Sequence, residues 1–235
     1  SNDAIMDGFI ITGGNADGDA YYRHGGGMIN YNGVSPSVSN CTFAGNRAYE
    51  GGAVYNYNLS SPKFDNCTFD GNHAGGGGAI VCRVGGSAKF NECTFSHNYA
   101  QWRGGVMIID YGSSPKFTGS SFLENKTDGN GGGVLLESVA AQLGIVSSHF
   151  DNCTFTGNTA RLRGGAMANK DAGDPLITGC AFNDNYAGNG GGAMANDYNV
   201  VVTMGECTFA NNTADSGNAD IDTDETSVVK DASGE

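Results

Sequence analysis

The fold of this chain is decided by a short stretch that recurs along it, written at residues 66–72 as Asn66-Cys67-Thr68-Phe69-Asp70-Gly71-Asn72. In each copy a phenylalanine is followed three residues later by an asparagine. The copies lie at Phe43/Asn46, Phe69/Asn72, Phe95/Asn98, Phe122/Asn125, Phe155/Asn158, Phe182/Asn185 and Phe209/Asn212. Successive phenylalanines are 26, 26, 27, 33, 27 and 27 residues apart. A period this regular indicates one supersecondary unit repeated along the chain.

The repeat runs through nearly all of the 235 residues without an intervening linker. Such a chain is expected to form one elongated solenoid in which each repeat contacts its neighbours. We predict a single β-helix domain over residues 1–221 and an acidic cap or linker over residues 222–235. The 39 glycines and four prolines lie at fixed places in the repeat, so they indicate turns and not disorder.

The net charge of −13 argues against nucleic acid or an anionic membrane surface as a partner, because the electrostatic interaction would be repulsive. Residues 215–235 carry seven of the acids and one lysine, so the repeats themselves are mildly acidic. No apolar run approaches the roughly 18–20 residues that span a bilayer, and no signal segment opens the sequence. We therefore expect no direct membrane insertion by this sequence.

The spacing of apolar residues divides each repeat into three short strands. The first strand follows a pair of glycines, and its bulkiest column is predicted to face the interior: Ile29, Val54, Ile80, Met107, Leu135, Met167 and Met194. The second strand supplies Val38, Phe64, Phe90, Phe117, Phe150, Ile177 and Met204. In the third strand, period-two alternation places Cys67 and Phe69 inside and Thr68 outside.

Strands this short, separated by glycine and asparagine turns, predict an all-β, three-sided parallel β-helix of seven to eight coils of about 26 residues. The recurring phenylalanines would stack as an internal ladder, and the recurring turn asparagines would form an amide ladder that stabilises the stack. Neither ladder is a catalytic signal. Met6, Phe9 and Ile11 fit the same columns, so the sequence starts within a coil, and we expect this N-terminal coil to favour end-to-end self-association.

One repeat is longer than the others: Phe122 and Phe155 are 33 residues apart, and the additional residues lie in the segment 135–148. Insertions in solenoids form loops, often on the binding face. A tolerated bulge and a binding loop both fit this segment.

The paired motifs Gly77-Gly78-Ala79-Ile80 and Phe95-Ser96-His97-Asn98 resemble the repeats of the chlamydial polymorphic outer-membrane proteins, and the wider class of bacterial right-handed parallel β-helix surface proteins. The resemblance covers roughly residues 4–221, and both motifs recur in phase seven times. It implies a right-handed β-helix that forms the secreted passenger of an autotransporter, with adhesion as its role. The C-terminal membrane barrel of that family is not present in this sequence.

Six of the seven cysteines share one column of the repeat, with Ser120 in the remaining slot. A column spreads its thiols along an axis, whereas zinc requires ligands that converge on one point. Side chains stacked in register are also poorly aimed for the dihedral angle of a disulfide. We therefore expect buried free thiols, with no metal and no cofactor.

Two further functions fit the pattern of residues less well. A polysaccharide lyase or glycoside hydrolase needs grouped carboxylates, but Asp65, Asp70, Asp110, Glu137, Asp151 and Asp184 are scattered over different columns, so no catalytic residue is assigned. An ice-binding surface would use the outward column that contains Thr68, yet the neighbouring outward column is too mixed for a flat plane. Threonine is also a common residue on the outward face of β-strands, whatever their function.

Residues at or beside the turns are the candidates for partner binding, because aromatic rings can stack on sugars or anchor a protein. The aromatic candidates are Tyr21, Tyr22, Tyr49, Tyr55, Tyr99, Trp102 and Tyr186, and Arg103, Arg161 and Arg163 form a candidate basic patch. We expect a non-catalytic extracellular β-helix module of a surface adhesin or structural stalk, binding protein or carbohydrate at a cell surface. A carbohydrate-active enzyme is the main alternative, and an ice-binding protein is the second.

Overall fold

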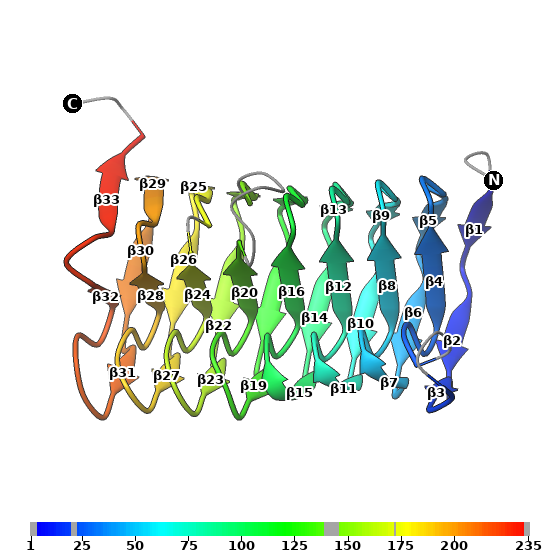
Figure 1. Cartoon of the computed structure of the whole chain (residues 1–235), viewed down its shortest axis with the longest axis horizontal. Helices are drawn as coiled ribbons and strands as arrows, with labels where there is room; N and C mark the ends of the chain where they lie inside the picture. The colour runs from blue at the N-terminus through cyan, green and yellow to red at the C-terminus, as the bar shows by residue number, and fades with distance from the viewer. Residues whose placement is uncertain (1–3, 20–22, 139–145, 172, 233–235) are drawn as a thin grey trace.

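The computed structural model describes residues 4–19, 23–138, 146–171 and 173–232, and Figure 1 shows them wound into a rod of stacked coils. Four parallel sheets run along the rod, one with nine strands and three with eight. The part of the chain that the structure describes contains no helix. The first and last described strands lie at opposite ends of the rod.

Each sheet collects the equivalent strand from successive coils. Sheet A consists of β1 (Ile5–Asp7), β5 (Ser37–Ser39), β9 (Lys63–Asp65), β13 (Lys89–Asn91), β17 (Lys116–Thr118), β21 (His149–Asp151), β25 (Leu176–Thr178), β29 (Val201–Gly205) and β33 (Val228–Asp231). Sheet B consists of β2 (Ile10–Thr12), β6 (Thr42–Ala44), β10 (Thr68–Asp70), β14 (Thr94–Ser96), β18 (Ser121–Leu123), β22 (Thr154–Thr156), β26 (Ala181–Asn183) and β30 (Thr208–Ala210).

The other two sheets carry the glycine-rich part of the repeat. Sheet C consists of β3 (Asn15–Ala16), β7 (Arg47–Glu50), β11 (His73–Gly76), β15 (Tyr99–Arg103), β19 (Lys126–Thr127), β23 (Thr159–Ala160), β27 (Tyr186–Ala187) and β31 (Thr213–Ala214). Sheet D consists of β4 (Met28–Tyr31), β8 (Val54–Tyr57), β12 (Ile80–Arg83), β16 (Met107–Asp110), β20 (Val134–Glu137), β24 (Met167–Lys170), β28 (Met194–Asp197) and β32 (Ile221–Thr223).

The predicted all-β parallel helix is confirmed, with four strands in each coil where three were expected. The additional strand, in sheet C, follows the ladder asparagine. The sequence does not predict it as a strand because its inward column is mostly alanine and carries no large apolar residue, yet its backbone pairs with both neighbouring coils, with one register shift between β11 and β15. Sharp corners need glycine: Gly51 has φ of 64°, and a Cβ there would lie 2.4 Å from the carbonyl oxygen of Val54.

The predicted aromatic ladder occupies the core. Phe69 pairs in register with Phe43 and Phe95, and its ring stacks on each of theirs with centroids 5.0 Å apart. A second stack, which contains Phe64 and Phe90, meets the first edge-on, for example at 5.5 Å between the Phe64 and Phe69 rings. Parallel and perpendicular contacts of this kind are the favoured arrangements of aromatic rings.

The predicted asparagine ladder lies at the corner between sheets B and C. Asn98 is fully buried, and its Nδ2 donates to the Phe69 carbonyl at 2.9 Å and to Asn125 Oδ1 at 3.0 Å. Its Oδ1 accepts from the backbone N–H of Asn72 at 3.0 Å. Each amide therefore joins its own coil to both neighbouring coils.

The ladder asparagines lie at the turns between sheets B and C, as predicted, and the structure adds that these turns are enclosed. All of them are buried: Asn46, Asn72, Asn98, Asn125, Asn158, Asn185 and Asn212. Asn158 and Asn185 repeat the pattern of Asn98, with Nδ2 of each 2.9 Å from the carbonyl oxygen of a ladder phenylalanine. A buried amide has to find its hydrogen-bond partners inside the protein, and here the partners are the equivalent residues of adjacent coils. The ladder is therefore structural and offers no surface to a ligand.

The two ends of the asparagine ladder are completed by other groups. In the first coil, where no ladder asparagine exists, Asn46 Oδ1 accepts from the backbone N–H of Gly14 at 3.0 Å, and Asn46 Nδ2 donates to the Ile11 carbonyl at 2.9 Å. At the other end, Asn212 Nδ2 donates to Asp220 Oδ1 at 3.0 Å in place of another asparagine. The carboxylate of Asp220 thus closes the ladder.

The terminal members of the other ladders are less enclosed than the rest. Phe209 is half-buried, although its ring still stacks on that of Phe182 at 5.1 Å between centroids. The cysteines are free, and all except the half-buried Cys207 are buried, as expected. Phe209 lies on β30, the last strand of sheet B, and Cys207 directly precedes this strand, so each lacks a neighbouring coil on one side in that sheet.

Two assignments of the interior column were wrong by one residue. Met28 and Val134 pair with the interior residues of the neighbouring coils, whereas Ile29 and Leu135 face outward. Both errors arise where three glycines precede the strand, because the sequence does not say which two of the three form the corner.

The strands also continue past the expected domain boundary at residue 221. Residues 222 and 223 complete β32, which pairs with β28, and β33 then pairs with β29. Of the long repeat insertion at residues 135–148, positions 139–145 lie outside the described residues.

Candidate binding groove on sheet C

Sheet C presents a column of polar and aromatic side chains directly after the ladder asparagine. The column pairs Arg47 with His73 and His73 with Tyr99. The next residue in each strand is small, and Ala74 is paired with Ala48 in this position. Ala74 is buried and faces the interior, and the next outward position of β11 is Gly75, which has no side chain, so the outer face of the sheet is hollowed here.

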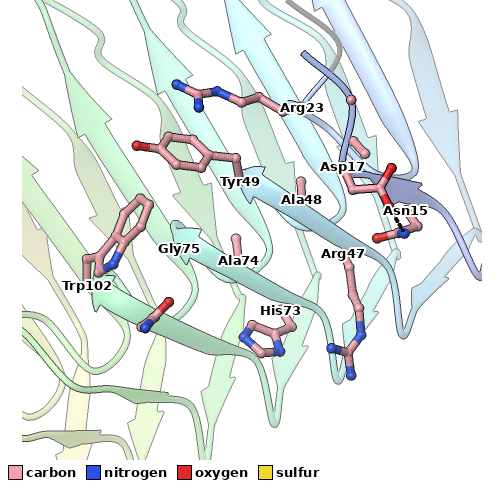
Figure 2. Close-up of a pocket in the computed structure, with 13 residues that line it drawn as sticks. Asn15, Asp17, Arg23, Arg47, Ala48, Tyr49, His73, Ala74, Gly75 and Trp102 are labelled. Atoms are coloured by element: carbon pink, nitrogen blue, oxygen red, sulfur yellow. Dashed lines mark hydrogen bonds between the residues drawn. The ribbon is translucent and has the colours of Figure 1, made fainter. Parts of the chain in front are cut away.

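The hollow has a volume of about 410 Å³ and spans the first four coils. Figure 2 shows Arg23, Tyr49 and Trp102 along one side of it and Arg47 and His73 along the other. Ala48, Ala74 and Gly75 lie between these two rows, and Asn15 and Asp17 lie toward one end. We call this hollow the sheet C groove.

The aromatic side of the groove is a continuous stack. The rings of Tyr49 and Trp102 meet edge to face, with 4.7 Å between centroids and 68° between planes. The guanidinium of Arg23 lies 3.7 Å from the centroid of the Tyr49 ring, a cation–π contact. Trp102 remains 44% exposed, so its ring is held in place and still available to a ligand.

A register shift produces this stack. The pairing of β11 with β15 shifts between Ala74 and Gly76, so that β15 carries an additional residue. Gly75 then lies under the indole, because a Cβ on it would be 2.5 Å from two atoms of the Trp102 ring. The absence of a side chain at this one position allows Trp102 to reach Tyr49 across the intervening coil.

A buried charge cluster lies next to the aromatic side. Arg83 bridges Glu50, at 2.7 Å, and the fully buried Asp110, at 2.8 Å. His24 is 3.6 Å from Glu50 and stacks on the ring of Tyr55. The cluster therefore joins the ends of sheet C strands to the outer face of sheet D. It also holds Glu50, the residue that follows Tyr49, in place.

Burial shifts the protonation of this cluster. Burial raises the pKa of Asp110 from 3.8 to about 6, because the hydrogen bond and charge of Arg83 lower it by less and the charge of Glu50 raises it further. Burial by itself would lower the pKa of Arg83, but hydrogen bonds and attraction from the two carboxylates raise it. Burial also raises the pKa of Tyr55 to about 12. The loss of hydration on burial therefore outweighs the attraction to Arg83 and sets the direction of the Asp110 shift.

The groove itself is more cationic than the rest of the surface. Arg23 and Arg47 line it, and Asp17, which accepts a hydrogen bond from Asn15 at 2.8 Å, is the one carboxylate among its described lining residues. Partial burial and then the charge of Arg47 lower the pKa of His73, so its imidazole is neutral at pH 7. The walls thus combine aromatic faces with two fixed positive charges.

A second hollow of about 380 Å³ lies farther along the same sheet and includes Arg161 and Tyr186. Tyr186 donates to Asp215 at 2.7 Å, and Tyr99, nearer the first hollow, donates to Asp128 at 2.6 Å. These hydrogen bonds raise the pKa of both phenols. Sheet C therefore carries ligand-accessible space in two places along one face.

The structure groups some of the residues predicted from the sequence and separates others. Tyr49 and Trp102 line the first hollow, and Arg161 and Tyr186 line the second. The candidate basic patch is not formed: Arg103 is paired with Glu137, and Arg163 with Asp197 and Asp222. Tyr21 and Tyr22 lie outside the described residues.

Among the lining residues with a cationic or imidazole side chain, sequence analysis missed Arg23, Arg47 and His73. Two of them are marked by a simple signal, since Arg47 directly follows the ladder residue Asn46, and His73 follows Asn72. Arg23 carries no such signal, because the first coil lacks the full motif. Its place is defined by the backbone pairing of Tyr49, which donates to its carbonyl.

The expectation that no column collects acids was also wrong. The fourth position of the sheet D strands pairs Asp110 with Glu137, and Lys170 with Asp197, in one outward column. Interleaved with Arg83, Arg103 and Arg163, these acids form ion pairs. Within the described ranges, no group of three or more His, Cys, Asp or Glu side chains is placed to hold a metal ion.

Comparison with known families agrees with this architecture. The model of the family described as "right handed beta helix region" matches residues 20–160, three fifths of the chain. The chain belongs to this right-handed β-helix family. No curated protein and no solved structure gives a significant match. A search of the described residues found no helix able to cross a membrane.

Proposed function

We propose that this right-handed β-helix is a non-catalytic binding module of an extracellular adhesin or structural stalk, and that it holds a glycan in the sheet C groove. The observation that carries this proposal is the pair of Tyr49 and Trp102, whose rings form one exposed edge of a preformed hollow with small residues beside them. Aromatic rings held rigidly pack on the apolar faces of sugars with little loss of side-chain entropy. The resemblance of the repeats to autotransporter passengers supports the extracellular setting.

The arrangement of carboxylates favours binding over hydrolysis. The sheet C groove has a single lining carboxylate, Asp17, among its described residues. In the second hollow, Asp128 and Asp215 lie three coils apart, which is about 14 Å along the axis at the usual strand spacing. Glycosidases hold their two carboxyl groups about 5–9.5 Å apart. An enzyme remains the alternative function, and the experiment includes an assay for it.

Glycan-array binding by three proteins tests the proposal: the native chain, Trp102→Ala and Tyr31→Ala. Tyr31 is also an exposed aromatic, but it lies on sheet D away from the groove, so its replacement is the matched control. We expect the native chain and Tyr31→Ala to bind the same glycans, and Trp102→Ala to lose them. Equal binding by all three proteins would remove the groove from the proposal. Release of reducing or unsaturated sugar from a bound polysaccharide would favour the enzyme instead.

A further inference from the structure

Three lysines are stacked on the outer face of sheet A, away from the groove: Lys63, Lys89 and Lys116. Each begins one of three neighbouring strands of the sheet, and all three are exposed and pair in register. His149 continues the column on the next coil. Figure 1 places the sheet A strands along one edge of the rod and the sheet C strands along the other. This lysine column is therefore a separate surface from the sheet C groove.

Like charges directly opposite each other on a sheet are destabilising. Adjacent strands are about 4.8 Å apart, well within the Debye length of about 8 Å at physiological ionic strength, so salt does not remove the repulsion. The sheet D column that contains Arg83 also sets two like charges side by side, Asp110 and Glu137, but a cation flanks each of them: Arg83 contacts Asp110, and Lys170 contacts Glu137. The lysine column departs from that pattern.

Neighbouring acids compensate only one of the three lysines. Lys63 Nζ lies 2.8 Å from Asp65 Oδ2. The residues equivalent to Asp65 beside Lys89 and Lys116 are the neutral Asn91 and Thr118. Neither of these lysines forms an ion pair with any residue that the structure describes.

The groups that border the column beside Lys89 and Lys116 are neutral hydrogen-bonding groups. On the side that precedes the strands, Ser61 and Ser87 form a serine column in which the Ser87 backbone N–H donates to Ser61 Oγ at 3.1 Å. At the far end of the column, partial burial and then the charge of Lys116 lower the pKa of His149, so its imidazole is neutral at pH 7. The result is a straight line of positive charge, bordered by hydroxyl and amide groups beside Lys89 and Lys116 and by the carboxylates of Asp65 and Asp151 toward its two ends, on a chain of net charge −13.

From this juxtaposition we propose that sheet A binds a linear acidic polysaccharide, which lies parallel to the rod axis with its carboxylate or sulfate groups on Lys89 and Lys116. The lysines repeat at the spacing of the coils on a rigid scaffold, so they match a partner whose charges also recur along a straight line. A stiff sugar chain offers such charges without the ordering cost that a disordered acidic peptide has to meet.

Two other anionic partners fit the surface less well. Nucleic acid fits less well because, in the described residues, the lysine column has no aromatic side chain beside it in sheet A on which a base could stack. The acidic segment of a second copy is already engaged within its own chain: Asp222 is paired with Arg163, and Asp224 accepts from the backbone N–H of Tyr198 at 2.8 Å. Both partners are included in the test as competing outcomes.

The test measures binding of polygalacturonate, dextran sulfate and uncharged dextran to the native chain, to Lys89→Gln/Lys116→Gln and to Lys230→Gln. Lys230 is the matched control, since it occupies the same outward column on β33 but is separated from the other lysines by neutral residues. We expect the native chain and Lys230→Gln to bind at least one acidic polysaccharide and to lose affinity as salt is raised. The double variant should bind it at least about tenfold more weakly, the factor that corresponds to about 1.4 kcal/mol. Polygalacturonate and dextran sulfate distinguish carboxylate from sulfate recognition.

Several results would overturn the proposal. One is equal binding by the native chain and the double variant, and another is equal binding of uncharged dextran. A preference for oligo(dT) or for poly-glutamate over both acidic polysaccharides would assign the surface to a different partner. The double variant is expected to fold, because it relieves a repulsion, and its melting temperature should equal or exceed that of the native chain. A large fall in melting temperature would mean that the lysines are structural, which would also contradict the proposal.

Discussion

The indole of Trp102 lies over Gly75 and meets the ring of Tyr49 at 4.7 Å between centroids, although the two aromatic residues come from strands that are not neighbours. The contact depends on a glycine in the intervening strand, since any side chain there would occupy the position of the indole. The exposed aromatic pair therefore depends on a glycine between the two rings as much as on the rings themselves.

Gly75→Ala is predicted to displace Trp102 with little effect on folding. The atoms in conflict with the new Cβ are the far end of the indole, at 2.5 Å, and this side chain can rotate away, so the free energy of unfolding should fall by less than about 1 kcal/mol. Trp102 is the one tryptophan of the chain, so its fluorescence reports the change directly. We expect emission shifted to longer wavelength and weaker glycan binding. Unchanged emission would mean that the indole does not rest on Gly75 in solution.

The aromatic ladder should be far more sensitive than the surface of the same strand. Phe95→Ala removes a fully buried ring that stacks on two neighbours, and the lost burial and the cavity should cost about 3–5 kcal/mol. Thr94→Ala removes a half-buried outward side chain and should cost much less. Chemical denaturation of both variants measures the difference. Similar losses would contradict the inside and outside assignment of sheet B.

The sequence predicts the fold because the core residues recur with a strict period. Every full repeat has a phenylalanine equivalent to Phe69 and an asparagine equivalent to Asn72. The buried ladders require both residues to stay in register, so their spacing alone indicates the length of each coil. Sheet C has no such marker, because its exposed columns vary from Arg47 to His73 to Tyr99 without altering the backbone. The site was therefore only partly predictable. Tyr49 and Trp102 were candidates, but their contact depends on the additional residue in β15. The 27-residue spacing from Phe95 to Phe122 shows that this repeat is one residue longer, but it does not show where the additional residue lies.

Self-association through the N-terminal coil remains a prediction from the sequence. In the described residues, β1, β2 and β3 pair on one side only, and Ile10 is 74% exposed. Replacement of Ile5 and Ile10 by lysine should prevent end-to-end stacking by charge repulsion. Small-angle scattering over a range of concentrations should show growth in whole-rod steps for the native chain and none for the variant. If both proteins stay monomeric at high concentration, the first coil is not an association surface.

The pairing of Arg83 with both Glu50 and Asp110 predicts how stability depends on pH. Because burial raises the pKa of Asp110 from 3.8 to about 6, the folded state binds more protons than the unfolded state between pH 4 and 6. The free energy of unfolding should therefore fall as the pH rises through this window, by up to about 1.4 kcal/mol per pH unit. Asp110→Asn should flatten this dependence.

Asp65→Asn is the control of opposite sign. Hydrogen bonds from Lys63 and Asn91 outweigh burial and lower the pKa of Asp65. The contribution of Asp65 to the free energy of unfolding is therefore lost as the pH falls. Unfolding curves at pH 4, 5, 6 and 7 measure all three proteins, and parallel curves for the native chain and Asp110→Asn would show that the pKa of Asp110 is the same in the folded and unfolded states.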